Sequence, residues 1–249
     1  MYGLSVERIW FPEDGVPVSS NADILRYLRV LPDQAEALHG AAEPAYTLLS
    51  DLTLPEDTLL SAMNKNYRYE VRRAQKEDVA VSVYDAADLR ADGSILTAFE
   101  KTYMDFCESL GNEDLKDDFD REKIASYVVH DCILLTKAEQ GNAVVFHLYV
   151  TDGVWAVLCY SASDFRDDSV DRASAGRMNK LLHWRDMLFL KGRGCRWYDW
   201  GNVSDPVNYN GIDTFKAGFG GAPATMYNLS VGNNLLGKVA VAALRCVKR

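Results

Sequence analysis

The chain has 249 residues, 48% of them hydrophobic, which is enough for a sizeable buried core in one large domain or two smaller ones. Its 27 Lys and Arg residues against 36 Asp and Glu residues give a net charge of −9, so binding of phosphate requires a local basic patch and general nucleic-acid coating is excluded. The sequence has five isolated cysteines, no signal peptide pattern and no apolar stretch of about 20 residues, so we expect a reduced, soluble, cytoplasmic protein without a transmembrane segment.

The first half of the chain predicts alternating strands and helices. A strand and turn are expected over 46–54, followed by one long helix over 54–76, whose proline and two acids suit a first helical turn. β-Branched residues over 79–85 predict another strand. Apolar residues at helical spacing and a terminal glycine predict a helix over 93–111, and a second short helix is expected to start near Asp120.

The second half begins with three consecutive predicted strands. Gln-Gly-Asn and Asp-Gly turn signals separate them, so an antiparallel meander is expected. A helix with an apolar face and a glycine close to its end follows. The predicted elements are strands over 131–141, 142–153 and 154–163, a helix over 173–194, a strand over 195–203, a short helix, a strand over 224–231 and an amphipathic segment over 235–249.

This order predicts an α/β (α+β) fold with a mixed, largely antiparallel sheet flanked by helices. No internal repeat or low-complexity segment interrupts the chain. We expect residues 1–78 to form a partial N-terminal lobe that carries a basic amphipathic helix. Residues 79–249 are expected to form the main domain.

The predicted helix over 54–76 has a basic face. At 3.6 residues per turn, Lys65, Arg68, Arg72 and Lys76 lie on one side and apolar residues lie on the other. Arginine suits phosphate because its planar guanidinium forms charge-assisted, often bidentate hydrogen bonds. The face is therefore either a binding site for a substrate phosphate or an ordinary solvated helix face.

Asp199 and Lys216 are candidates for chemistry. Asp199 follows Tyr198 at the expected end of a strand, where its carboxylate would orient an amine, act as a base, or only cap the following turn. Lys216 lies between Phe215 and a run that contains three glycines. Lys216 is either a point charge that binds phosphate, with the glycines allowing the backbone to approach the ligand closely, or only a basic residue near a glycine-rich turn.

The segment Arg172–Lys180 enters the predicted helix over 173–194. Ser174 and free backbone N–H groups at such a junction can hold a pyrophosphate, although an ordinary helix start has the same features. The histidines show no metal-ligand spacing, so no metal site is predicted and each is expected to be a core or surface residue. They are His39, His130, His147 and His183.

Three segments, residues 50–81, 179–203 and 211–221, resemble in order and spacing the FemAB-like branch of the GNAT acyltransferase superfamily. The most specific of them contains Phe-Lys-Ala-Gly-Phe-Gly-Gly, from Phe215 to Gly221. The resemblance implies a GNAT-like fold and transfer of an aminoacyl or acyl group to an amine. Better-known members use aminoacyl-tRNA to extend the peptide of a peptidoglycan precursor, which implies a role in cell wall biogenesis.

The resemblance also implies roles for individual residues. Phe215 and Lys216 would lie near the acyl donor or its tRNA end, and Lys65, Arg68 and Arg72 would bind the phosphate of a phosphorylated sugar or peptide precursor. In CoA-dependent GNAT proteins the pyrophosphate loop reads Gln/Arg-x-x-Gly-x-Gly/Ala. Residues at comparable spacing here are Arg172, Ala175 and Arg177, so Arg172, Ser174 and Arg177 are the candidates for cofactor binding.

The expected reaction is direct transfer, because alignment of donor and amine accelerates acyl transfer without a side-chain nucleophile. Lys216 would stabilise charge on the donor, Asp199 or a substrate phosphate would assist proton movement, and Tyr198 and Phe215 would contact the substrate. No covalently bound cofactor is expected, and the donor is aminoacyl-tRNA or acyl-CoA. Two alternatives are an acyl-CoA-dependent N-acetyltransferase acting on a small amine or amino sugar, and a non-catalytic module that binds anionic glycans or RNA.

Overall fold

The computed structural model describes residues 3–12, 20–38, 40–111, 116–117, 119–164 and 172–247. The chain divides into two compact units, each of which combines segments distant in sequence. The smaller unit comprises Met1–Leu48, Asn202–Asp213 and Ala222–Arg249, and the larger comprises Leu49–Gly201 and Thr214–Gly221. The boundary expected between residues 78 and 79 does not separate these units, because the chain on both sides of it belongs to the larger one.

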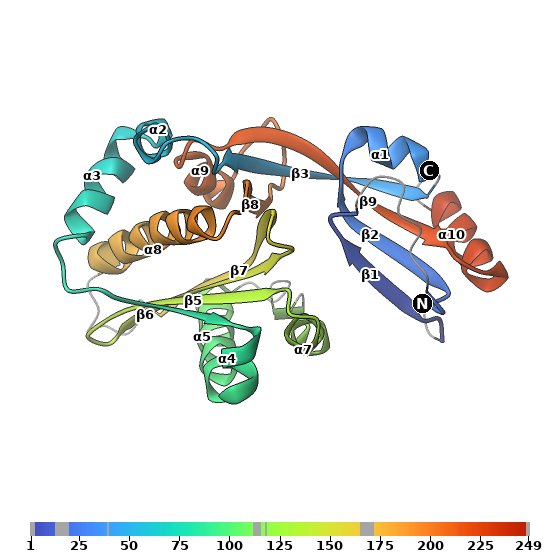
Figure 1. The fold of residues 1–249 in the computed structure, drawn as a ribbon, viewed down its shortest axis with the longest axis horizontal. Helices are drawn as coiled ribbons and strands as arrows, with labels where there is room; N and C mark the ends of the chain where they lie inside the picture. Colours follow the sequence, from blue (N-terminus) through green and yellow to red (C-terminus); the bar gives the residue numbers. More distant parts are fainter. Residues whose placement is uncertain are drawn as a thin grey trace. The chain divides into compact units, whose positions relative to one another are not determined.

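The larger unit is built on a sheet with the strand order β8-β7-β6-β5-β4 (Figure 1). Neighbouring strands are antiparallel from β4 to β7, whereas β7 and β8 run parallel. The predicted meander and the mixed, largely antiparallel sheet are therefore confirmed. The strands are β4 (Ala80–Asp85), β5 (Ile133–Gln140), β6 (Ala143–Thr151), β7 (Trp155–Asp164) and β8 (Trp197–Asn202).

Helices cover both faces of this sheet. Figure 1 shows α8 on one face and α4, α5 and α7 on the other. On the α8 side, Met178 and Leu182 are buried in one cluster with Ala138 and Val145 from the sheet. This burial explains why the apolar stripe over 173–194 predicted a helix. The bounds are α4 (Ala86–Ala91), α5 (Ser94–Leu110), α7 (Arg121–Val129) and α8 (Arg172–Gly192).

Two predicted helix boundaries follow from local chemistry. Gly111 ends α5 in the left-handed conformation with φ 62°, which glycine adopts without the strain of a Cβ. The side chain of Asp120 accepts a hydrogen bond from the backbone N–H of Lys123 and so caps the start of α7. Both predictions are confirmed.

The prediction of one long helix over 54–76 is wrong. The chain forms α2 (Glu56–Ala62) and α3 (Lys65–Ala74), separated by Met63 and Asn64 in extended conformations. The Asn64 side chain accepts from the backbone N–H of Tyr67 at 2.9 Å, while its own backbone N–H donates to the Gly218 carbonyl. Asn64 is therefore a helix start within a pattern that reads as helical throughout.

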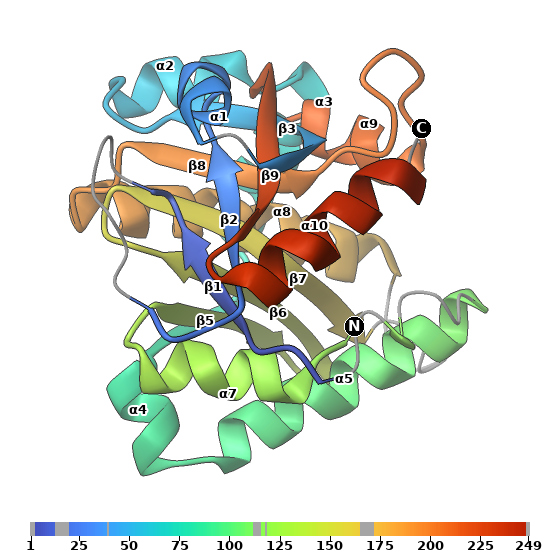
Figure 2. The ribbon, with the colours of Figure 1, turned by 90° about the vertical axis from the view of Figure 1, so that its right-hand side faces the viewer.

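The smaller unit has the strand order β1-β2-β9-β3. β1 and β2 are parallel, β2 and β9 are antiparallel, and Figure 2 shows α10 lying across β9 and β2. Leu25, Tyr27, Val30 and Leu229 form its buried cluster. The elements are β1 (Val6–Trp10), β2 (Ile24–Val30), α1 (Pro32–Ala37), β3 (Ala41–Asp51), α9 (Gly211–Ala217), β9 (Ala222–Gly232) and α10 (Leu235–Val247).

The chain passes between the units at two of these elements, because β3 and α9 begin in the smaller unit and end in the larger one. Within the described ranges, no helix combines the length and the apolar character that crossing a bilayer requires.

Candidate active site

The parallel pairing of β7 and β8 ends beside a glycine, Gly201. The two strands pair in parallel from Trp155 and Trp197 to Val157 and Asp199. A Cβ on Gly201 would lie 2.5 Å from the carbonyl oxygen of Leu158, and Gly201 has φ +76°, so no other residue fits there without strain. Ligands often bind beyond the carboxyl ends of parallel strands.

Lys216 reaches this position from α9. Its side chain is half-buried, and its Nζ would lie 3.7 Å from a Cβ on Gly201. The glycines after Lys216 have another purpose: a Cβ on Gly218 would lie 2.4 Å from the Tyr67 ring, and one on Gly220 would lie 2.4 Å from the Ala62 carbonyl oxygen. Close packing against α2 and α3 therefore explains these glycines, whereas it does not explain the lysine.

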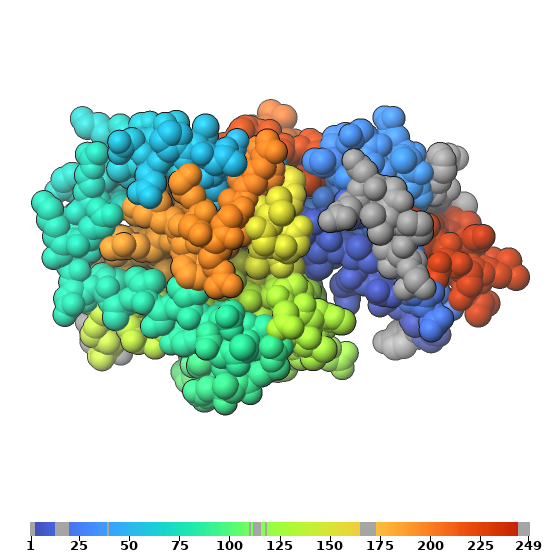
Figure 3. All heavy atoms as spheres, viewed as in Figure 1, coloured from blue at the N-terminus to red at the C-terminus, as the bar shows by residue number. Residues whose placement is uncertain are grey.

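Lys180 is a second cation of this site. Its Nζ lies 3.0 Å from a carboxylate oxygen of Glu70, and it sits 4.9 Å from the ring centre of Tyr67 and 5.6 Å from that of Phe215. Figure 3 shows α3, which carries Tyr67 and Glu70, beside α8, which carries Lys180. Aromatic faces and one carboxylate thus hold this ammonium group in place.

A buried hydrogen-bond network, which includes His183, lies close to these two cations. The His183 ring is 5.7 Å from that of Phe215 and stacks on His147 at 3.9 Å. Its Nδ1 is 2.8 Å from the Tyr198 hydroxyl, which is 2.7 Å from the Tyr149 hydroxyl. The Tyr149 hydroxyl in turn donates to Asp186 Oδ2 at 2.6 Å.

His147 completes the network from β6. Its Nδ1 is 2.7 Å from Asp186 Oδ2, and its Nε2 is 2.8 Å from the side-chain oxygen of Asn179. The side chains of His147 and Asp186 are 0% and 1% exposed. The other carboxylate oxygen of Asp186 is buried and accepts no hydrogen bond from the described residues. Burial of so many polar groups costs stability, which is typical of sites with a chemical task.

The surroundings keep His183 and the two tyrosines of the network neutral. Burial lowers the pKa of His183 well below its usual value, and the charges of His147, Lys216 and Lys180 lower it further. Burial also raises the pKa of Tyr149 and of Tyr198 well above the usual value. The imidazole of His183 is therefore uncharged and the two phenols keep their protons at neutral pH.

The same network contains a set of potential metal ligands. One atom each of His147, His183 and Asp186 lies within 4.8 Å of the others. However, both ring nitrogens of His147 and Nδ1 of His183 already take part in hydrogen bonds. An ion would have to displace these bonds, so the described geometry fits a hydrogen-bond network better than a metal centre.

The basic face of the predicted helix does not meet Lys216 as one patch. Lys65 and Arg72 are exposed on α3, on the side away from Tyr67. Arg68 donates to the carbonyl oxygens of Ser61 (2.8 Å) and Met63, so it caps the end of α2. Of the three predicted phosphate ligands, Arg68 thus has a structural partner, whereas Lys65 and Arg72 face solvent.

The candidate cofactor residues are also engaged within the protein. Arg177 pairs with Glu77 through two nitrogens at 3.1 Å and is 8% exposed, and the Ser174 hydroxyl donates to Gln140 at 3.1 Å. The side chain of Arg172 lies outside the described residues, as does His39. The described contacts of Ser174 and Arg177 therefore hold α8 against the segment that follows α3 and against β5.

Asp199 and Tyr198 lie beneath the site rather than on its surface. Both are fully buried, and Asp199 Oδ1 accepts a hydrogen bond from the backbone N–H of Gly201 at 2.8 Å. This bond is the turn cap expected as the alternative to a base. Tyr198 contributes through the network, in which it joins Tyr149 to His183.

The sequence analysis missed His183, His147 and Lys180. A signal existed for His183 and Asp186: at a spacing of three residues they share the apolar face of the predicted helix over 173–194, where polar side chains are unexpected. His147 had no local signal, because its partners come from α8, more than 30 residues later. The other described histidine, His130, is exposed at the end of α7, as expected.

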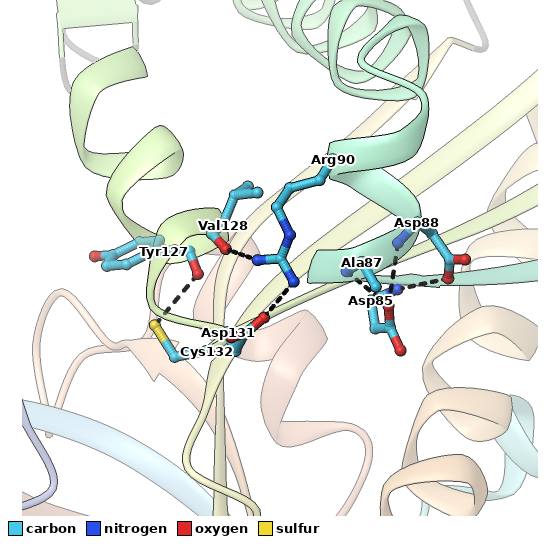
Figure 4. A network of polar contacts seen from close by, with 8 residues as sticks. All are labelled: Asp85, Ala87, Asp88, Arg90, Tyr127, Val128, Asp131 and Cys132. Atoms are coloured by element: carbon cyan, nitrogen blue, oxygen red, sulfur yellow. Dashed lines mark hydrogen bonds and ion pairs between the residues drawn. The ribbon is translucent and has the colours of Figure 1, made fainter.

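A second polar network lies at the surface of the larger unit (Figure 4). Arg90 of α4 donates to the Val128 carbonyl oxygen at the end of α7 and to Asp131, both at 2.6 Å. A cavity of about 360 Å³ opens beside it, lined in part by Asp85 and Asp131. The Arg90 network joins two helices and contains none of the residues around Lys216.

Comparison with known proteins finds similarity at the level of structure. No family model and no curated protein sequence matches the chain. The crystal structure of FemX matches with a TM-score of 0.62 and 13% identity, over 90% of this chain and 74% of that chain. The C-terminal domain (DUF2156) of a putative lysylphosphatidylglycerol synthetase from Agrobacterium fabrum matches with a TM-score of 0.53 and 14% identity, over 89% and 72%. The chain thus shares its fold with FemX and with this synthetase domain, in agreement with the mixed, largely antiparallel sheet flanked by helices that the sequence predicted.

Proposed function

We propose that this chain is a FemAB-like N-acyltransferase that moves an aminoacyl or acyl group to an amine of a cell-envelope or polysaccharide precursor. The observation that supports the proposal is the position of Lys216 and Lys180 around His183, where the parallel pairing of β7 and β8 ends. The likeness to FemX supports the proposal through the fold. Charged tRNA and acyl-CoA occur in the cytoplasm, so we propose that the protein acts there.

The chemistry needs no nucleophile from the protein. The amine nitrogen forms a bond to the carbonyl carbon of the donor ester or thioester, and the bond to the leaving oxygen or sulfur breaks. One proton leaves the amine and one proton goes to the leaving group. The ammonium of Lys216 would stabilise negative charge on the carbonyl oxygen or leaving group, and alignment of the reactants supplies much of the acceleration.

Donor and acceptor are both expected to carry phosphate. Lys216 and Lys180 offer point charges near the reacting groups, while the exposed Lys65 and Arg72 would bind a more distant phosphate of a phosphorylated sugar or peptide precursor. Because Ser174 and Arg177 are bonded within the protein, aminoacyl-tRNA is the preferred donor over acyl-CoA. The acidic chain requires that such tRNA contacts be local.

The test is a transfer assay with two donor sets. The protein is incubated with charged tRNAs or with acyl-CoAs, together with UDP-linked amino sugars and muropeptides, and products are detected by mass spectrometry. We expect an N-acylated product from the wild-type protein and a loss of at least about 100-fold for Lys216→Ala. Lys101→Ala is the matched control, because this lysine of α5 is 77% exposed, and it should retain full activity.

Three outcomes would change the proposal. Product from acyl-CoA alone would favour the N-acetyltransferase alternative. Absence of product, together with salt-sensitive binding of a phosphorylated glycan or RNA, would favour a non-catalytic module. Full activity of Lys216→Ala would remove the site assignment even if the reaction itself were correct.

A further inference from the structure

The donor and the acceptor of each hydrogen bond in the buried network follow from counting the protons of its side chains. A tyrosine hydroxyl carries one proton, and Tyr149 donates its proton to Asp186. The hydrogen bond between the two tyrosines must therefore be donated by Tyr198. Because the proton of Tyr198 is then in use, the bond to His183 must be donated by Nδ1–H of the imidazole.

This count determines the tautomer of His183. A neutral imidazole carries one N–H, so with the proton on Nδ1 its Nε2 bears the free lone pair. The described residues offer no hydrogen bond to this atom. It lies on the ring edge that does not face Tyr198, and the ring packs against Phe215 and Phe219. A hydrogen-bond acceptor is therefore available beside the two lysines.

The same reasoning applies to His147. Its Nδ1 faces a carboxylate oxygen of Asp186 and its Nε2 faces the side-chain oxygen of Asn179. Both partners accept hydrogen bonds, so both ring nitrogens donate and His147 is an imidazolium paired with the Asp186 carboxylate. In each of the three hydrogen bonds that link His183 to Asp186, the donor is therefore the group on the His183 side and the acceptor is the group on the Asp186 side.

We propose that Nε2 of His183 accepts the proton released by the attacking amine, and that Tyr198 and Tyr149 carry a proton on to Asp186. This inference rests on the proposed function. As the amine N–H bond breaks, an Nε2–H bond forms; Nδ1 gives its proton to Tyr198, Tyr198 gives its own to Tyr149, and Tyr149 gives its own to Asp186 Oδ2. Return of the proton from Nε2 to the leaving group reverses these shifts, so the enzyme ends unchanged.

The groups that surround His183 fit this role. The two cations discourage formation of an imidazolium, so passage of the proton to Asp186 keeps the ring neutral during the reaction. Asp186 Oδ2, which receives the proton, lies 2.6 Å from the Tyr149 hydroxyl and is therefore in line with the last transfer of the relay. Titratable groups around the ring are His147 on β6, Lys180 on α8, Tyr198 on β8 and Lys216 on α9.

The first test needs no substrate. Long-range ¹H–¹⁵N spectra of protein labelled at histidine nitrogens distinguish a protonated from a bare ring nitrogen. We expect one histidine with a proton on Nδ1 alone, assigned to His183 by its loss in His183→Gln, and one with protons on both nitrogens, assigned by its loss in His147→Gln. A proton on Nε2 of His183, or a bare nitrogen on His147, would overturn the relay.

The second test is kinetic and uses the acyl-transfer assay. His183→Gln should lower kcat by about 10²–10⁴-fold, the range for loss of a general base, with little change in KM for the acceptor. In this variant kcat should rise with pH as the amine loses its proton to solvent, whereas wild-type kcat should stay level around neutral pH. The exposed residue His130 provides the control variant, His130→Gln.

A conservative variant separates catalysis from folding. Tyr198→Phe keeps the ring in the core but removes the acceptor of the Nδ1 proton, so it should lower kcat and mix the His183 tautomers in the spectra. Wild-type kinetics in both His183→Gln and Tyr198→Phe would exclude His183 as the proton acceptor. If wild-type protein transfers nothing from either donor, the proposed function and this role of His183 fail together, whatever the tautomer.

Discussion

The network around His183 and the network around Arg90 use similar bonds in opposite surroundings. Both join a cationic side chain to a carboxylate at 2.6–2.7 Å. The side chains of His147 and Asp186 are 0% and 1% exposed, whereas those of Arg90 and Asp131 are 45% and 69% exposed. Solvent screens the exposed pair, so it contributes little to the free energy of unfolding. Burying the other pair costs desolvation energy, and removing one of its partners destabilises the fold further because the remaining group stays buried without a partner. Bond length alone therefore says little about what a pair does.

The largest expected effect comes from removing one partner of the buried pair. Asp186→Ala leaves the His147 imidazolium without its counterion and should reduce the free energy of unfolding by about 3–5 kcal/mol. Asp131→Ala, the same deletion in the exposed network, should change it by at most about 1 kcal/mol. Urea unfolding of both variants measures the contrast. Equal losses would mean that burial does not separate the two networks.

A smaller effect is expected from a hydroxyl inside the buried network. Tyr149→Phe removes a donor to Asp186 and leaves the Tyr198 hydroxyl without its acceptor, so it should cost about 1–3 kcal/mol. Tyr69→Phe, at an exposed position, is the matched control and should be neutral. The comparison uses the same unfolding measurement. A neutral Tyr149→Phe would show that these hydroxyls find other partners.

The pH dependence of stability sharpens the comparison further. Burial lowers the pKa of His183, so below about pH 6.5 the unfolded chain binds a proton there that the folded chain does not. Stability should therefore fall as the pH drops from about 6.5 toward 5, by up to about 1.4 kcal/mol per unit. His183→Gln should flatten this decline, which unfolding midpoints at several pH values would reveal. An unchanged slope would contradict the buried, neutral histidine.

The smallest effect is expected at Arg90. Arg90→Ala removes the exposed ion pair and the hydrogen bond to the Val128 carbonyl, and should cost no more than about 1 kcal/mol. The loss should shrink further in high salt, because exposed pairs are screened. Unfolding measured at low and high salt tests this. A loss comparable to that of Asp186→Ala would remove the distinction between the two networks.

The sequence predicted elements well where a periodic pattern coincided with burial. The meander over β5, β6 and β7 and the helix α8 follow from alternation, turn signals and an apolar stripe. The break between α2 and α3 was missed because it depends on Gly218, far along the chain, which accepts the backbone N–H of Asn64. No element was predicted before residue 46, where β1, β2 and α1 lie.

The candidate site was only partly accessible from sequence. Lys216 and Phe215 stood out through their motif, and the structure brings both close to His183. His147 and Lys180 did not, because their significance depends on neighbours that only the folded sheet supplies. The basic stripe on α3 shows the same limit: periodicity indicated which residues share a face but not that Arg68 caps α2.

The discontinuity of the larger unit has a consequence for biosynthesis. Lys216 and Phe215 belong to the segment Thr214–Gly221, which returns to this unit only after residues 202–213 have been added to the smaller one. A nascent chain that has been translated as far as Gly201 thus contains the whole hydrogen-bond relay but lacks the lysine proposed to stabilise the donor. Ribosome stalling or proteolysis between Gly201 and Thr214 would therefore yield N-terminal fragments that lack the segment with Phe215 and Lys216.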